Sequence, residues 1–197
     1  PDLNGSAFGG SIANAGDVNG DGFSDIVVGS ANGGTGKAYV FSGLTGTILF
    51  TLDPGIITGG SSEVAGGSDY NFDGINDFFV GSYQSNIIHI YSGANGALLT
   101  QINGPASTSF GGIFDVGDFN GDSYGDIVAY VNSPSSHFNI YSGPNNNLLY
   151  TFARPGLLFQ GSNPANGIST IFDFNSLNSI LWGDTSGFIG TEKLGGV

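Results

Sequence analysis

The sequence predicts an all-β protein, a β-propeller of about four blades in which each blade is a four-stranded antiparallel sheet. Two observations support this fold class. A block recurs along the chain, and Gly43, Gly93 and Gly143 stand 50 residues apart at the same point of three copies. Each copy holds four short runs of β-branched and aromatic residues bounded by Gly, Asn and Ser, which is typical of strands. Four short strands in a repeat of this length indicate a propeller blade, whereas the repeats of a β-helix are shorter.

The composition agrees with a chain of many short strands. The 197 residues include 36 glycines, yet 39% of the residues are hydrophobic and 13% are aromatic. Such a chain can bury a core, so the high glycine content does not indicate disorder. We interpret the glycines as turns between strands.

The first repeat shows the expected order of elements. Residues 7–16 are predicted to form the first strand, and an acidic loop at residues 17–25 leads into a second strand at 25–30. A third strand is predicted at 37–43 and a fourth at 47–52, after a tight turn. The second strand lacks polar alternation in every copy, so we expect it to be covered on both faces.

The same order repeats along the chain, and the fourth copy is degenerate. The third and fourth strands recur as one phrase at residues 39–52, 88–102 and 138–152. A fourth acidic phrase begins at Asp173, but Leu177 interrupts its series of polar residues. The predicted blades are residues 1–54, 55–104, 105–155 and 156–197.

The acidic loop of the first repeat has the composition of a cation site. Asp17, Asn19, Asp21 and Asp25 place oxygen atoms at positions one, three, five and nine, and position six is a glycine. Carboxylates this close repel one another unless a cation lies among them. A hard dication takes roughly six to eight oxygen ligands, and a loop with oxygens on alternate positions can wrap around it. Similar loops follow in the second and third repeats.

The expected ligands are the side chains at positions one, three, five and nine and the backbone carbonyl at position seven. They are Asp17, Asn19, Asp21, Phe23 and Asp25 in the first loop, Asp69, Asn71, Asp73, Ile75 and Asp77 in the second, and Asp118, Asn120, Asp122, Tyr124 and Asp126 in the third. Magnesium prefers fewer carboxylates, and zinc or copper would require His or Cys, which these loops lack. A single loop of this kind is equally well explained as a polar turn whose side chains cap the backbone. Three copies favour calcium, so we expect about three calcium ions with a structural role and none in the fourth loop.

The motif also carries a resemblance to a known family. FGGSIANAGDVNGDGFSDIVVGS followed by GKAYVFSG resembles the FG-GAP repeat of integrin alpha-subunit β-propellers and of many secreted bacterial proteins. The likeness extends over residues 6 to 152, although the second repeat has VAGG where the first has FGGS. It implies a propeller with calcium in its acidic loops and a location outside the cell. The family's usual rings have more blades than this chain supplies.

The charge balance excludes several classes of partner. Only three basic residues stand against 16 acidic residues, which gives a formal net charge of −13. A chain without a basic surface is not expected to bind nucleic acid, and anionic membranes would repel it. We expect no membrane span, because no apolar run approaches the ~20 residues needed to cross a bilayer.

Few residues are candidates for catalysis, and we expect no enzyme. His89 and His137 are the two histidines, and neither accompanies a recognisable nucleophile motif. Asp115 and Asp118 would be a candidate glycosidase pair, but Asp118 is better explained as a calcium ligand. Trp182 is a candidate platform for stacking on a sugar, but it falls in the second strand of the fourth repeat, where we expect it to fill the core.

We predict an extracellular module with a structural or adhesive role, in which calcium holds the loops in place. The alternative is a carbohydrate-binding, lectin-like propeller, so the ligand would be a protein or a glycan. The fourth repeat has a third strand at residues 187–194 but no outer strand, and residues 1–6 are a poor substitute. Because an unpaired edge recruits a strand from another chain, we expect this unit to assemble with copies of itself or with further repeats.

Overall fold

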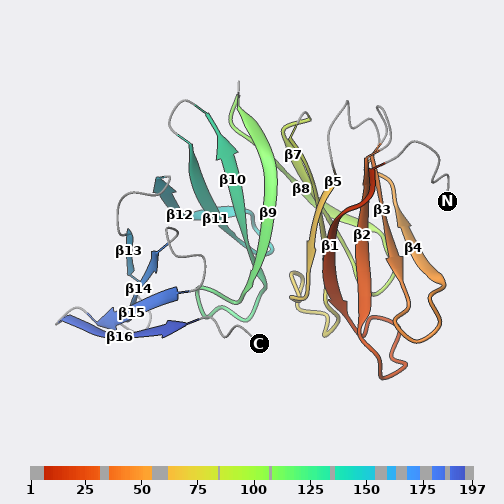
Figure 1. Ribbon diagram of the computed structural model, residues 1–197, viewed down its shortest axis with the longest axis horizontal. Coiled ribbons are helices and arrows are strands. Elements are labelled where there is room, and N and C mark those ends of the chain that lie inside the picture. Colours follow the sequence, from red (N-terminus) through yellow and green to blue (C-terminus); the bar gives the residue numbers. More distant parts are fainter. Residues whose placement is uncertain are drawn as a thin grey trace.

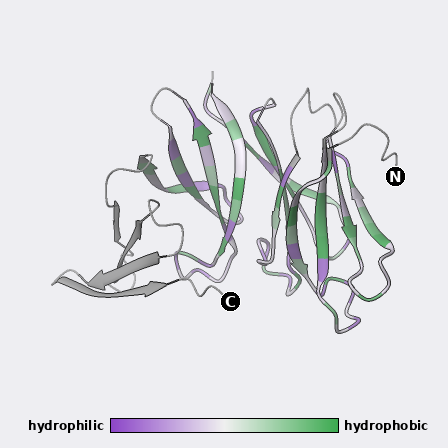
Figure 2. Ribbon diagram, viewed as in Figure 1, coloured by the Kyte–Doolittle hydropathy of each residue, from purple (hydrophilic) through white to green (hydrophobic). Residues whose placement is uncertain are grey.

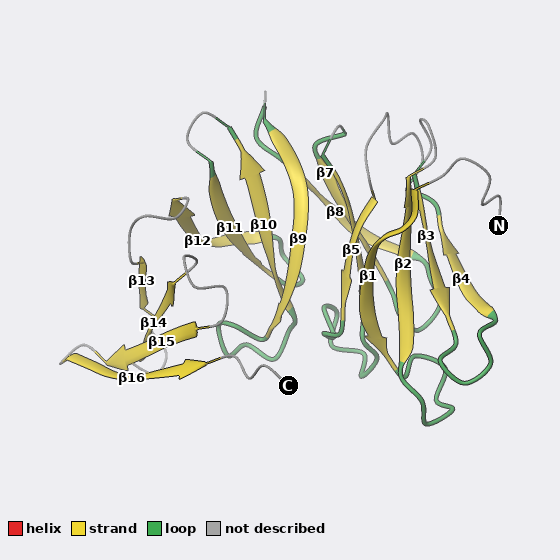
Figure 3. Ribbon diagram, viewed as in Figure 1, coloured by secondary structure: helices red, strands yellow, loops and turns green. Residues whose placement is uncertain are grey.

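Strands and loops make up the described structure (Figure 3). The computed structural model describes residues 7–31, 36–54, 62–83, 85–106, 108–133, 136–153, 159–162, 168–173, 179–184 and 187–193. Within these ranges every regular element is a strand, which confirms the all-β class. These residues therefore include no helix that is long and apolar enough to cross a membrane.

The described strands form four antiparallel sheets, each built from four consecutive strands (Figure 1). The first sheet contains β1 (Ala7–Gly16), β2 (Asp25–Ala31), β3 (Lys37–Phe41) and β4 (Ile48–Leu52). The second contains β5 (Ser62–Gly66), β6 (Phe78–Ser82), β7 (Ile87–Tyr91) and β8 (Leu98–Asn103). The third contains β9 (Ser109–Gly117), β10 (Asp126–Asn132), β11 (His137–Ser142) and β12 (Asn147–Ala153). The fourth contains β13 (Phe159–Ser162), β14 (Ile168–Asp173), β15 (Ser179–Asp184) and β16 (Gly187–Lys193).

The first sheet follows its predicted elements closely. β1 has the predicted bounds, β2 is one residue longer, and β3 and β4 are slightly shorter than the runs at 37–43 and 47–52. The register of β1 on β2 shifts between Asn14 and Gly16, where the strand turns into the acidic loop. Gly16 has a φ of +72°, a left-handed conformation that glycine adopts without strain. A local break in the strand thus begins the loop.

The core lies between successive sheets and not inside any one of them. β1, β5 and β9, the first strands of the three sheets, lie side by side (Figure 1). The first interface buries residues such as Val27, Val40 and Leu52 against Phe78 and Val80. The second interface buries Phe79, Ile88, Ile90, Phe110, Ile127 and Val131, among others. Figure 2 shows the apolar residues concentrated on the strands that form these interfaces.

The second strand is covered on both faces only where a sheet has two neighbours. All five residues of β6 are buried, as the absence of polar alternation predicts. In β2, by contrast, Ile26 is 41% exposed, although the equivalent residues Phe78 and Ile127 are completely buried. The difference has a simple cause. Among the described residues, no other sheet packs against the outward face of the first sheet.

The first three sheets pack one after another, and a closed propeller is not shown. Extensive contacts join the first sheet to the second and the second to the third. The fourth sheet has the order β13-β14-β15-β16, and β16 (Gly187–Lys193) is the strand expected at residues 187–194. The prediction missed β13, which pairs with the edge of β14 that does not face β15. The fourth sheet therefore has four strands. Residues 1–6, the other expected partner, lie outside the described residues.

Candidate metal centres

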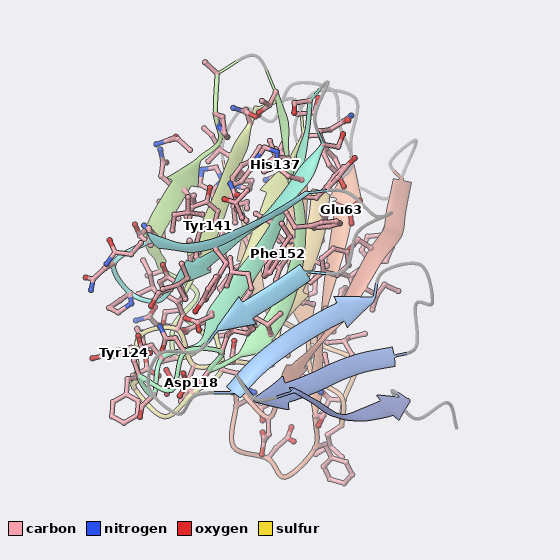
Figure 4. All side chains as sticks on the ribbon, turned by 90° about the vertical axis from the view of Figure 1, so that its left-hand side faces the viewer. Glu63, Asp118, Tyr124, His137, Tyr141 and Phe152 are labelled. Carbon is pink, nitrogen blue, oxygen red and sulfur yellow. The ribbon has the colours of Figure 1, made fainter. Side chains whose placement is uncertain are left out.

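The three acidic loops connect the first two strands of their sheets at the same end of the molecule. The first loop (residues 17–25) follows β1, the second (69–77) precedes β6, and the third (118–126) follows β9. All three lie at the lower end of Figure 1. Figure 4 places Asp118 and Tyr124 together at this end of the third sheet, whereas His137 lies at the opposite end. The candidate ligands of the third loop are therefore separated from His137, at the start of β11, by the length of the sheet.

Side chains at positions one, three and five fold each loop around its own backbone. In the first loop Asp17 Oδ1 accepts the Asp21 N–H at 3.0 Å, and Asp17 Oδ2 accepts the Gly22 N–H at 2.8 Å. Asn19 Oδ1 also accepts the Asp21 N–H at 2.9 Å, and Asp21 Oδ1 accepts the Phe23 N–H at 2.9 Å. The second and third loops repeat all four bonds within 0.1 Å. Three separate segments thus adopt one conformation.

Positions four and six of each loop have a left-handed backbone. Glycine occupies position four in the first and third loops and position six in the first and second. The exceptions are Phe72 at position four of the second loop, with a φ of 61°, and Ser123 at position six of the third, with a φ of 75°. Residues with a Cβ adopt this conformation at a cost, so the surrounding bonds hold these two in place. All three loops therefore require a left-handed backbone at position six, and the glycine in the first loop meets this requirement without strain.

The aspartate at position nine is buried in every loop and joins two distant parts of its repeat. Asp25 is completely buried, as are its equivalents in the other loops, Asp77 and Asp126. Asp25 Oδ2 accepts the Val18 N–H at 2.9 Å, and Oδ1 accepts the Gly43 N–H at 3.0 Å. The same pair of bonds recurs in the second and third loops, with Gly93 and Gly143 as the distant donors. The carboxylate at position nine thus attaches the loop to the turn between the third and fourth strands.

Burial has an electrostatic consequence at position nine. Desolvation raises the pKa of Asp77 to about 6, although hydrogen bonds from Gly93 and Tyr70 oppose the rise. Desolvation likewise raises the pKa of Asp126 to about 6 against its own backbone donors. A cation beside these carboxylates would lower both pKa values, because an opposite charge favours the ionised form. Two costly buried charges are therefore placed where a cation would stabilise them.

A serine of the turn between the third and fourth strands also reaches the loop. Ser42 Oγ donates to Asp21 Oδ2 at 3.3 Å, and Ser142 Oγ donates to Asp122 Oδ2 at 3.0 Å. At Asp122, desolvation is the largest single effect and raises the pKa, but the hydrogen bonds from Tyr124, Asn120 and Ser142 together outweigh it, so the pKa is lowered. In the sequence, the glycine of this Ser-Gly pair is a landmark of the repeat. The recurrence of the whole pair at residues 42–43, 92–93 and 142–143 was the available signal for the serine, which contacts the loop in the first and third repeats.

The donor set fits calcium in its chemistry. Each loop offers carboxylate and amide oxygens at positions one, three, five and nine, which are the ligands that a hard dication prefers. Each oxygen that accepts one backbone N–H keeps a second lone pair for a metal. Among the described residues, however, no group of three or more acidic or histidine side chains is gathered closely enough to hold an ion. The structure brings the predicted ligands into one loop each but not into a converged site, so calcium binding stays a prediction.

The other candidate residues do not come together into a site. His89 is 7% exposed, and burial lowers its pKa, which agrees with a core position. Asp115 accepts a hydrogen bond from Ser68, whereas Asp118 binds the amides of its own loop, so their environments differ. The side chain of Trp182 and the fourth acidic loop beyond Asp173 lie outside the described residues.

Comparisons with known proteins agree with this geometry. A model of the FG-GAP repeat matches residues 8–41, and a model of the FG-GAP-like repeat matches residues 69–129. The chain carries FG-GAP repeats. Residues of the FG-GAP chain align at 38% identity over 93 residues with integrin alpha-3 from Cricetulus griseus and from Mus musculus. This alignment covers 42% of the chain and 9% of each integrin, so the chain corresponds to a small part of those relatives.

A solved structure is also similar to the chain in its overall fold. It is a crystal structure of a protein of unknown function from Bacteroides caccae, with a TM-score of 0.48 and 11% sequence identity. The match covers 96% of the FG-GAP chain and 68% of the other. A similarity at this level carries no argument about function.

Proposed function

We propose that the chain is an extracellular β-propeller module in which calcium stabilises the acidic loops and which has a structural and adhesive role. One observation carries the proposal: the same pattern of oxygen ligands, in the same loop conformation, joins the same two strands of three FG-GAP repeats. A polar turn that only caps its backbone does not require an acid at positions one, five and nine in every copy. The similarity to integrin alpha-3 supports the adhesive role and the location outside the cell.

In this proposal each ion is held by the ligands of one loop. In the first loop the side chains of Asp17, Asn19, Asp21 and Asp25 and the carbonyl of Phe23 would bind it, and the other two loops would use their equivalents. A bound dication would neutralise the mutual repulsion of the carboxylates. Position nine would then connect the ion, the start of the loop and the distant glycine of the Ser-Gly turn. The role of calcium is thus to hold the end of each sheet together.

Thermal unfolding in calcium and in EDTA tests this role. A ligand that binds only the folded state stabilises it by about 2.7 kcal/mol per site at a hundredfold excess over Kd. Asp21→Ala, Asp73→Ala and Asp122→Ala should each remove part of the calcium-dependent rise in melting temperature. Glu63→Gln removes an acid outside the loops and should leave the rise intact. Equal melting temperatures in calcium and EDTA, together with no heat of binding in calorimetry, would contradict the proposal.

The outward face of the first sheet supports a role in assembly. Ile12 and Ile26 on this face are 60% and 41% exposed, and Phe8 is 37% exposed. The rings of Phe8 and Phe41 pack edge to face, with their centroids 6.1 Å apart. In the second and third sheets the equivalent face packs on the preceding sheet. We propose that a sheet from a second copy of this chain covers the outward face in the same way, which would add a further sheet before the first.

Analytical ultracentrifugation over a range of protein concentrations tests the assembly. The unmodified chain should self-associate in calcium, and Ile12→Ser combined with Ile26→Ser should weaken the association. Leu98→Ser, which changes an exposed apolar residue on β8, is the control for lower surface hydrophobicity. A chain that stays monomeric at every concentration would rule out the second copy. Further repeats of a longer protein would then be the partner to test.

The proposed role is non-enzymatic, and a glycan array separates it from the carbohydrate-binding alternative. The array should be run in calcium and in EDTA. Calcium-dependent binding to one class of glycan would favour the lectin-like alternative. No glycan binding, with intact stabilisation by calcium, would favour the structural and adhesive role.

A further inference from the structure

The second and third acidic loops contact each other directly. The Gly125 N–H, at position eight of the third loop, donates to the carbonyl oxygen of Asp69, at position one of the second loop, at 2.7 Å. The ring centroids of Phe72, in the second loop, and Tyr124, in the third, lie 5.6 Å apart. Asp69 and Tyr124 are themselves candidate ligands, and Phe72 and Gly125 are next to candidate ligands in the sequence. A change in the backbone of one loop therefore acts on the other.

A second connection runs through the interior. Tyr70, at position two of the second loop, is 1% exposed, and its hydroxyl donates to Asn146 Oδ1 in the turn of the third sheet. Gly143 of the same turn packs so tightly on Tyr70 that a Cβ would lie 2.9 Å from the Tyr70 carbonyl oxygen. The Gly143 N–H in turn donates to Asp126 Oδ1 at 3.2 Å. Gly143 thus lies between a residue of the second loop and the carboxylate at position nine of the third.

The first and second loops meet through packing of a different kind. The side chain of Asn76 covers Gly16, where a Cβ would lie 2.2 Å from Asn76 Nδ2. Val18 holds the place of Tyr70 and has no hydroxyl to reach a turn. Gly93, the equivalent of Gly143, has close neighbours from its own sheet, Asn76 and Ile75. Among the described contacts, the backbone hydrogen bond and the buried tyrosine therefore join only the second and third loops.

We infer that calcium binds cooperatively to the second and third loops and independently to the first. This inference rests on the proposed calcium sites. An ion in the second loop would fix Asp69 and, through its carbonyl, the segment of the third loop around Gly125. Ordering one loop lowers the entropy that the other loses on binding, which produces positive cooperativity without a change of fold. Coupling free energies between sites correspond to about a fivefold change in affinity or more.

A calcium titration followed by NMR resolves the three loops separately. The amide signals of Gly22, Gly74 and Ser123, at position six, report the first, second and third loops. In the unmodified chain the signals of Gly74 and Ser123 should change together, with a curve steeper than that of one independent site. Asp73→Ala should raise the calcium midpoint at Ser123 about fivefold or more. Asp21→Ala, the matched change in the first loop, should leave that midpoint unchanged.

Two further measurements connect the effect to the contacts. Reciprocity requires that Asp122→Ala raise the midpoint at Gly74 by the same factor. Phe72→Gly removes the ring contact, and Asn146→Gly removes the acceptor of Tyr70. Both substitutions should preserve the left-handed backbone, because glycine occupies the equivalent positions in other repeats. In either background Asp73→Ala should shift the midpoint at Ser123 by less than it does in the unmodified chain.

The outcomes separate the inference from the proposed function. An unchanged midpoint at Ser123 in Asp73→Ala would overturn the coupling and leave calcium binding standing. An equal shift at Ser123 from Asp21→Ala would overturn the independence of the first loop. If no loop amide responds to calcium, the proposed function itself fails. The remaining amide signals show in each case whether the variant is folded.

Discussion

Replacing Asp77 by alanine tests whether position nine stabilises the fold even without calcium. The Asp77 carboxylate is completely buried. It accepts the N–H groups of Tyr70 and Gly93 at 2.9 Å and that of Asn71 at 3.2 Å. Asp77→Ala leaves these three backbone donors without their acceptor, and the bonds from Tyr70 and Gly93 are buried. The loss should therefore appear in the apo protein as well as in the calcium-bound form.

The size of the effect follows from the number of donors. A buried donor without a partner costs roughly 1–3 kcal/mol, so the two shorter bonds alone correspond to roughly 2–6 kcal/mol. Removing a carboxylate that is itself buried at a cost offsets part of this loss. We expect Asp77→Ala to lower the free energy of unfolding by about 2–4 kcal/mol. In a domain of this length, that corresponds to a melting temperature about 4–16 °C lower.

Thermal unfolding in EDTA, followed by circular dichroism, measures this loss. Asp73→Ala is the matched control, because it removes a candidate ligand of the same loop whose side chain is exposed. In EDTA it should change the free energy of unfolding by less than about 1 kcal/mol. In calcium both variants should lose the stabilisation that the second site contributes. Equal melting temperatures of the two variants in EDTA would refute the structural role of position nine.

Two further predictions concern single residues. Ser123→Gly should raise the free energy of unfolding by about 0.5–1 kcal/mol in denaturant titrations, because Ser123 has a φ of 75°, and Gly74→Ser should lower it similarly. Changes of the same sign in the two variants would contradict this reasoning. Burial lowers the pKa of His89, so its imidazole is protonated in the unfolded chain before it is protonated in the folded chain as the pH falls below about 6.5. The free energy of unfolding therefore decreases from there down to the folded-state pKa. His89→Asn should remove this part of the pH dependence in EDTA; identical pH profiles for the unmodified chain and His89→Asn would show that His89 contributes nothing.

The strands could be predicted because their signals are local. A run such as residues 7–16 is apolar and ends at a glycine before an acidic turn, so its bounds are visible in the sequence. The repeat then transfers each assignment to the next copy. The fourth repeat lacks the phrase that closes the others, and there the prediction missed β13. Its pairing with β14 arises from two segments that the repeat pattern does not align.

The role of position nine could not be predicted in the same way. In the sequence Asp25 is one of four oxygen-bearing residues with equal claims to a metal. In the fold it is completely buried and accepts the N–H of Gly43, 18 residues away. A Cβ on Gly43 would lie 1.9 Å from the carbonyl oxygen of Ser24, so only glycine brings its N–H this close. The glycine was the clearest landmark of the repeat, but its reason is a contact between elements that no local pattern encodes.

Position two shows why loop stability and sheet packing are linked in this fold. Val18 is buried in the core between the first and second sheets, and Tyr70 is buried in the core between the second and third. Both residues donate their backbone N–H to the carboxylate at position nine of their own loop. One residue thus takes part in the loop through its backbone and in the next interface through its side chain. A ligand that orders the loop would then also favour the packing of the following sheet, and a sheet that lacks its neighbour would hold its loop less firmly. We therefore expect the proposed binding at the acidic loops and the proposed assembly of the sheets to report on the same packing.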